Sequence, residues 1–228
     1  MPDDAARPRL QGGRVVLLHG MGQDHSQFDG VAPLLADRGV EVVTPDLMGL
    51  SLAAMVDEVR PHVTDGAVVG GVSMGAAVSL AYAVQPDARC SALVQIGPAF
   101  DGSSRAPEGA RGYLDWLADT LEAGGFDALR AAGEPMADFW AARFPPEHLL
   151  GLWRDLSLGM PVPDPADVRV PALVIAWPDD GLHPMEVARS LAARLPDAEL
   201  VEVPFPADLQ LPAAPIATAL LDLFHSSR

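Results

Sequence analysis

Short runs of apolar residues recur along the chain, and each is followed by a turn-forming stretch and then by a segment of helical spacing. Most of these runs are continuous rather than alternating, which is typical of strands that are covered on both faces. They occupy residues 14–18, 40–44, 68–72, 92–96, 170–177 and 199–203. Strands that alternate with helices predict an α/β fold with a mostly parallel central sheet and helices on both faces.

The segments between these runs carry apolar residues three and four positions apart, the spacing of helices that pack on a sheet. The helices are expected at residues 26–38, 52–59, 76–84, 184–195 and 216–224. Residues 1–13 are polar and rich in Pro and Gly, and we interpret them as a loose lead-in.

The alternation is interrupted between Asp101 and about Asp167, where aromatic and aliphatic residues in helical spacing are separated by Gly and Pro breaks. A helical insertion of this length between two strands predicts a lid rather than a simple crossover. We expect most of its aromatic side chains to serve packing and some to line a substrate pocket. The chain is therefore predicted to be one domain over residues 1–228, with a lid at about 101–167.

Composition and charge narrow the classes of partner. With 228 residues and 49% hydrophobic content, the chain can bury one sizeable core. Its net charge of −16 argues against a nucleic acid or an anionic membrane as partner. No apolar stretch approaches the roughly 20 residues of a membrane span, and the first residues lack a signal-peptide pattern. A cytoplasmic protein is the expectation.

Cys90 is the single cysteine, so neither an intramolecular disulfide nor a cysteine-based zinc site is available. We interpret it as a buried thiol. No metal and no organic cofactor are predicted.

The stretch Gly71-Val72-Ser73-Met74-Gly75 joins an apolar strand to a helix. A serine in such a sharp bend takes strained backbone angles, and glycines two positions away on each side leave room for the crossing chains. Ser73 is thereby raised above the sheet at the positive end of the following helix, where developing negative charge is stabilised. We predict that Ser73 is a nucleophile.

In these features the chain resembles the α/β-hydrolase superfamily. The matching features are His19-Gly20-Met21-Gly22 after the first strand, the bend at Ser73, the lid insertion, and the Asp-bearing loop before His183-Pro184. The resemblance implies that the backbone N–H groups of Met21 and Met74 form an oxyanion hole, and that His19 braces the first loop without transferring protons. Such donors contribute roughly 3 kcal/mol each to transition-state stabilisation.

The resemblance also places the acid of a catalytic triad after the penultimate strand. Asp180 matches that position, with Asp179 as the alternative. Compared with the family, the chain looks trimmed: thirteen residues are too few for the antiparallel hairpin that usually precedes the first central strand.

The family's base, a histidine after the last strand, is absent, because the loop over residues 204–210 contains none, and Asp208 falls near its place. His183 in the acid loop, His25 after the oxyanion motif and His148 in the lid are the candidates to replace it. His62 and His225 are interpreted as surface residues.

Three functions follow from this pattern. The first is a serine hydrolase of a small apolar carboxylic ester, thioester or lactone, with Ser73 as nucleophile, Asp180 as orienting acid and His183 as the candidate base. The second is a lyase or cyclase of the same fold that uses Asp208 or Asp180 for proton transfer. The third is a catalytically inactive protein that binds an apolar small molecule under the lid.

Overall fold

The computed structural model describes residues 13–102, 108–158, 163–204 and 211–225 of the chain. In these residues six strands form one sheet in the order β2-β1-β3-β4-β5-β6, and every neighbouring pair is parallel. The strands are β1 (Arg14–Leu18), β2 (Glu41–Val43), β3 (Val68–Val72), β4 (Ala92–Ile96), β5 (Ala172–Ala176) and β6 (Ala198–Glu202). The predicted α/β sheet is confirmed.

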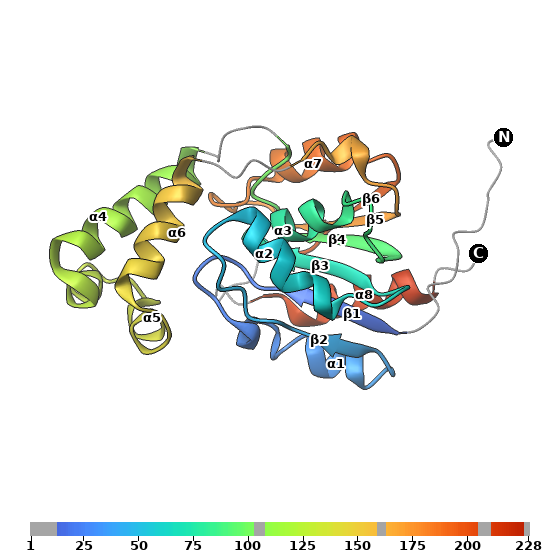
Figure 1. Cartoon of the computed structure of the whole chain (residues 1–228), viewed down its shortest axis with the longest axis horizontal. Helices are drawn as coiled ribbons and strands as arrows, with labels where there is room; N and C mark the ends of the chain where they lie inside the picture. Colours follow the sequence, from blue (N-terminus) through green and yellow to red (C-terminus); the bar gives the residue numbers. More distant parts are fainter. Residues whose placement is uncertain (1–12, 103–107, 159–162, 205–210, 226–228) are drawn as a thin grey trace.

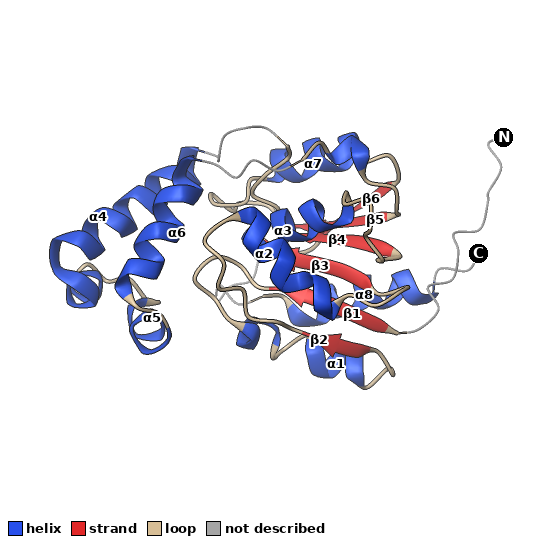
Figure 2. Cartoon of the chain, viewed as in Figure 1, coloured by secondary structure: helices blue, strands red, loops and turns tan. Residues whose placement is uncertain are grey.

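Helices cover both faces of the sheet, as Figure 2 shows. On one face lie α1 (Ala32–Ala36) and α8 (Ala213–His225), and on the other lie α2 (Leu52–Val59), α3 (Met74–Ala83) and α7 (Met185–Arg194). Each layer has its own apolar core, because the apolar side chains of the strands extend to both faces. Every residue of β3, β4 and α3 is buried, so the strand and the helix that flank Ser73 are rigidly embedded.

The predicted helical insertion lies between β4 and β5. It consists of α4 (Glu108–Ala131), α5 (Ala137–Arg143) and α6 (Pro146–Leu158), and α4 bends at Gly124 and Gly125, which have non-helical backbone angles. Figure 1 shows the three helices as a separate group beside the carboxyl ends of the strands. The rings of Trp140 and Trp153 pack edge to face at 4.9 Å and join α5 to α6. Whether this insertion opens and closes as a lid stays a prediction.

Two local predictions differ from the structure. The helix expected at 26–38 is split into a single turn of 3-10 helix, η1 (His25–Phe28), and the short α1, because Pro33 favours a new start there. The strand expected at 40–44 is paired over only three residues, as an edge strand. The predicted trimming before β1 concerns residues that lie almost wholly outside the described ranges. Within those ranges, no helix combines the length and apolar character required to cross a bilayer.

Candidate active site

Ser73 occupies a strained bend between β3 and α3. Its backbone angles are φ 54° and ψ −110°, a conformation that non-glycine residues rarely adopt. Its N–H donates to the carbonyl oxygen of Ile96 on β4 at 3.0 Å, which holds the bend against the sheet. A side chain at Gly75 would have its Cβ 2.1 Å from the carbonyl oxygen of Leu18, and one at Gly71 would collide with Gly75. Both glycines are therefore required for the close approach of the chains, as the motif predicts.

A tight turn follows β1 and carries Met21. The N–H of Gln23 donates to the carbonyl oxygen of Gly20 at 3.2 Å, so residues 20–23 form a β-turn. Its third residue, Gly22, has φ +63°, a backbone angle that favours glycine. The N–H of Gly20 donates to Oε1 of Gln27 at 2.7 Å. The N–H of Met21 is not used by the turn's own hydrogen bond.

The side chain of His19 supports this turn through two hydrogen-bonding contacts. It is buried, its Nδ1 lies 2.9 Å from the carbonyl oxygen of Gly20, and its Nε2 accepts from the N–H of Leu47 at 2.8 Å. This pattern requires the proton on Nδ1. Burial lowers the pKa of His19, so the ring is neutral at physiological pH. The contacts agree with the prediction that His19 supports the loop rather than transferring protons.

Asp180 sits in the loop after β5 and accepts four hydrogen bonds. Oδ1 receives the N–H groups of Leu182 and His183 at 2.8 and 3.1 Å, while Oδ2 receives Nε1 of Trp177 at 2.7 Å and lies 2.8 Å from Nδ1 of His183. Burial alone would raise the pKa of this carboxyl group. The hydrogen bonds from His183, Trp177 and Leu182 outweigh burial and hold the pKa well below its ordinary range.

The ionised carboxylate fixes the tautomer of His183. A carboxylate without a proton only accepts hydrogen bonds, so Nδ1 of His183 carries the hydrogen. The other ring nitrogen, Nε2, then has a free lone pair and is able to accept a proton. His183 and Asp180 together have the arrangement of a base and the acid that orients it.

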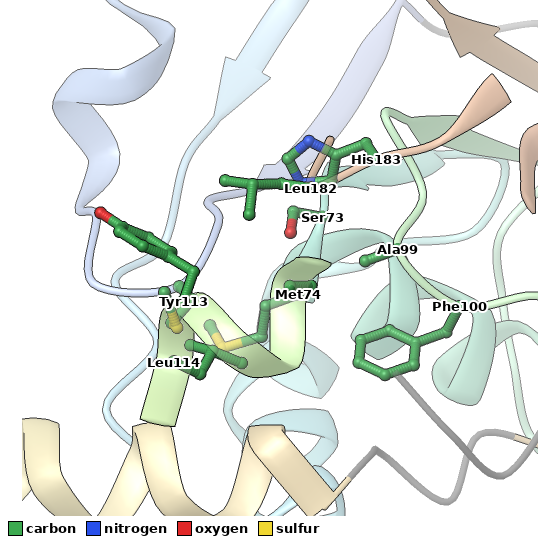
Figure 3. A pocket seen from close by; sticks show the side chains of 10 residues that line it. Ser73, Met74, Ala99, Phe100, Tyr113, Leu114, Leu182 and His183 are labelled. Atoms are coloured by element: carbon green, nitrogen blue, oxygen red, sulfur yellow. The ribbon is translucent and has the colours of Figure 1, made fainter. Parts of the chain in front are cut away.

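One small, mainly apolar cavity connects these elements. Its volume is about 60 Å³. It is lined by Met21, Ser73, Met74, Ala99, Phe100, Ala110, Tyr113, Leu114, Leu182 and His183. Figure 3 shows Ser73, Leu182 and His183 on one side of this space, with Tyr113 and Leu114 of α4 across from them. Ser73 and His183, predicted as nucleophile and base, thus face the same cavity. In the described residues no hydrogen bond joins their side chains, and such bonds are often long or unformed before substrate binds.

Gly97 lies next to the rings of Trp177 and His183. It directly follows β4, the strand between β3 and β5, and has φ +49°. A Cβ at this position would lie 3.0 Å from the ring of Trp177 and 3.7 Å from Cγ of His183. The missing side chain leaves space for the indole of Trp177, and the imidazole of His183 lies at van der Waals distance from the same point. The imidazole therefore lies beside the end of β4, which neighbours β3, the strand that leads to Ser73.

The remaining candidate bases lie elsewhere. His25 is exposed and pairs with Asp46 through Nδ1 at 3.0 Å, a contact that raises its pKa. His148 stacks on Phe144, and neither His25 nor His148 lines the cavity. His62 is half-buried. Asp208 and the side chain of His225 lie outside the described residues.

Two further predictions concern Asp179 and Cys90. Asp179 is exposed with φ 63°, so it is Asp180 and not its neighbour that meets His183. Cys90 is buried, as predicted, and burial raises the pKa of its thiol to about 11. In the described part of the chain no cluster of three or more His, Cys, Asp or Glu side chains is arranged to hold a metal ion.

Sequence reasoning missed three contributors to this site. The bond from Trp177 to Asp180, the space above Gly97 and the wall formed by Phe100 and Tyr113 were not predicted. Trp177 and Gly97 each end a predicted strand on the carboxyl side of the sheet, and that position is the one signal that could have identified them.

Three features define an α/β hydrolase: the strained serine, the parallel sheet, and the loop between β5 and α7 that holds Asp180 and His183, called the acid–histidine loop below. Comparison with known proteins gives the same result: the sequence profile of the alpha/beta hydrolase family matches residues 15–209, and the chain belongs to this family. The relatives support a hydrolase of this fold.

Two curated relatives and one solved structure illustrate the similarity. A 2-hydroxy-6-oxo-6-phenylhexa-2,4-dienoate hydrolase of Burkholderia cepacia is 28% identical over 83% of this chain and 79% of its own length. A pimeloyl-[acyl-carrier protein] methyl ester esterase of Aromatoleum aromaticum is 31% identical over 82% of this chain and 87% of its own. The structure of a thermophilic esterase from Thermogutta terrifontis matches with a TM-score of 0.68 at 21% identity, covering 94% of this chain and 90% of that one.

Proposed function

We propose that the protein is a serine hydrolase of small, apolar carboxylic esters, thioesters or lactones. Ser73 is the nucleophile, His183 the general base, Asp180 the acid that orients it, and the N–H groups of Met21 and Met74 the oxyanion donors. The observation that carries the proposal is the 2.8 Å contact between Nδ1 of His183 and Oδ2 of Asp180, in a loop whose histidine faces the same cavity as Ser73. No cofactor takes part in this chemistry.

The reaction proceeds in two halves. Oγ of Ser73 attacks the carbonyl carbon while Nε2 of His183 takes its proton, and the carbonyl oxygen becomes an oxyanion between the N–H groups of Met21 and Met74. When the bond to the leaving oxygen or sulfur breaks, His183 returns the proton to that atom, which leaves an acyl-enzyme on Ser73. A water molecule then repeats the sequence: His183 takes its proton, the carboxylic acid is released, and the proton returns to Ser73.

The size and lining of the cavity support a small, uncharged acyl group. Its volume of about 60 Å³ is far below the 300–1,000 Å³ of pockets for drug-sized ligands. Apart from Ser73 and His183, its walls are Met, Ala, Leu, Phe and Tyr side chains. Residues 108–158 carry nine acidic and four basic side chains, so the charge around the insertion does not favour an anionic substrate.

The alternative of a lyase or cyclase through Asp180 has less support. Its carboxylate is ionised and occupied by Trp177, Leu182 and His183, so it is a poor proton donor near neutral pH. The same alternative through Asp208 concerns a residue outside the described ranges and stays a prediction. Esterase activity separates an inactive binding protein from the proposed hydrolase.

The test uses p-nitrophenyl acetate, butyrate and octanoate with wild-type protein and Ser73→Ala. We expect turnover that falls with acyl length in the wild type and is lost in Ser73→Ala, with unchanged circular dichroism. A fluorophosphonate should label wild-type protein at Ser73, as located by peptide mass spectrometry. Equal rates in both proteins, or a label on another residue, would contradict the proposal. Absence of both turnover and label would favour the binding or lyase function.

A further inference from the structure

A buried hydrogen bond joins the helical insertion to the turn that carries Met21. Nε1 of Trp140 on α5 donates to the carbonyl oxygen of Gly22 at 2.7 Å, across 118 positions of sequence. Trp140 is 2% exposed, so water does not compete for this bond. A Cβ at Gly22 would lie 2.8 Å from the same Nε1, and the absence of a side chain lets the indole reach the backbone.

An ion pair beside this bond makes a second connection. Nε of Arg143, also on α5, lies 2.5 Å from Oδ2 of Asp24, and its guanidinium rests on the ring of Phe139 at 3.9 Å. Asp24 in turn accepts from the N–H of Ser26 at 2.9 Å and is the N-cap of η1. Burial raises the pKa of Asp24, but the hydrogen bonds from Ser26 and Arg143 outweigh it and lower the pKa overall. Asp24 is therefore ionised at neutral pH.

The other end of the turn is held by the main body of the protein. Gln27 accepts from the N–H of Gly20, and the ring of His19 contacts the carbonyl oxygen of Gly20. Met21 thus lies between an anchor in the body at Gly20 and an anchor in the insertion at Gly22. The orientation of its peptide group depends on both anchors.

We propose that Trp140 is a positioning residue for hydrolysis: its hydrogen bond to Gly22, together with the ion pair of Arg143 with Asp24, holds the turn so that the N–H of Met21 points at the oxyanion. This inference rests on the proposed function, because it takes Met21 as an oxyanion donor. Trp140 does not line the cavity and acts through the turn. A donor misplaced by about 1 Å loses much of its effect on the transition state, and such a shift costs up to about 100-fold in rate.

The test compares Trp140→Phe with Trp153→Phe. Trp153 is the matched control: it is a fully buried tryptophan of the same insertion, it packs on Trp140, and its Nε1 has no hydrogen-bond partner among the described residues. We expect Trp140→Phe to lower kcat for p-nitrophenyl butyrate by about 10- to 100-fold with KM unchanged. Trp153→Phe should leave both constants near the wild-type values. A fall in kcat of equal size in the two variants, or a change confined to KM, would overturn the inference.

Hydrogen–deuterium exchange separates this inference from the proposed function. Peptides covering residues 17–28 should exchange faster in Trp140→Phe than in Trp153→Phe, whether or not the protein hydrolyses esters. Equal exchange in the two variants overturns the inference. If the wild type shows no esterase activity but the exchange difference is present, the proposed function fails while the anchoring of the turn by Trp140 stands.

A second pair of variants applies if Trp140→Phe does not fold. Arg143→Gln removes the ion pair to Asp24, and Arg130→Gln removes ion pairs to Asp127 and Asp138 within the insertion. The two arginines are equally exposed, and neither change opens the core. Arg143→Gln should lower kcat by up to about fivefold and speed the same exchange, and Arg130→Gln should do neither. Identical behaviour of the two variants contradicts the inference.

Discussion

Oδ2 of Asp180 lies 2.8 Å from Nδ1 of His183, only three positions away in the same loop. The resemblance to the hydrolase family led us to expect acid and base on two loops, after two different strands. Here one loop after β5 holds Asp180 and the histidine that we propose as the base, and that histidine lines the same cavity as Ser73. Asp180 and His183 thus provide a candidate base, although the loop over residues 204–210 contains no histidine.

Asp180→Asn should lower kcat by about 10⁴-fold while the protein stays folded. An amide can donate to Nδ1 of His183, which would move the ring hydrogen to Nε2 and remove the lone pair that takes the proton from Ser73. Asp179→Asn is the matched control, because Asp179 is exposed and asparagine tolerates its positive φ. Esterase assays of both variants provide the measurement. Equal activity of the two would show that Asp180 does not orient the base.

The first turn of α4 touches the acid–histidine loop, which leads to a second prediction. A Cβ at Gly109 would lie 2.8 Å from the carbonyl oxygen of Gly181, whereas one at Gly112 would meet nothing within 4 Å. Gly112→Ala should therefore raise the free energy of unfolding by about 0.5–1 kcal/mol, the gain expected for alanine over glycine in a helix, without changing activity. Gly109→Ala should displace the loop of His183, lower kcat by about tenfold and lose the stability gain.

Denaturant unfolding and p-nitrophenyl butyrate turnover of the two glycine variants test this contact. If Gly109→Ala were as stable and as active as Gly112→Ala, the close contact between α4 and the loop at Gly181 would be contradicted.

Much of this architecture could be predicted from the sequence, because it depends on local patterns. Continuous apolar runs identify buried strands, and glycines at positions 71 and 75 identify the bend at Ser73. The contacts of His19 and the burial of Cys90 also agree with prediction, since each follows from its place in a strand end or turn.

The rest depends on contacts between distant segments, which leave no trace in local spacing. Trp140 and Gly22 are 118 positions apart, and neither has a neighbour pattern that indicates a hydrogen bond between them. His183 lies beside Gly97 at the end of β4, although the two residues are 86 positions apart (183 − 97). The choice among His183, His25 and His148 therefore required the fold.

The pH dependence of stability should distinguish His19 from His25, because the fold shifts their pKa values in opposite directions. Burial lowers the pKa of His19, so the stability that its neutral ring contributes is present above about pH 6.5 and is lost as the pH falls. The hydrogen bond to Asp46 raises the pKa of His25, so its contribution is present at low pH and is lost as the pH rises. Between about pH 7 and pH 5.5, His19→Gln should weaken the fall in the free energy of unfolding, and His25→Gln should steepen it.

Urea unfolding at several pH values provides this measurement. A steeper fall in His19→Gln would mean that the buried ring is charged in the folded protein, which contradicts its role as an acceptor for the N–H of Leu47.

The most direct test of the account is the turnover of His183→Gln compared with Ser73→Ala and with the double variant. If His183 is the base, each single change should lower kcat for p-nitrophenyl butyrate by about 10⁴- to 10⁶-fold, and the double variant should be no slower, because the two residues act as a unit. His62→Gln, a half-buried histidine outside the cavity, should keep wild-type activity. Near-wild-type turnover in His183→Gln, together with a dead Asp208→Asn, would contradict the account and make Asp208 the working acid–base group.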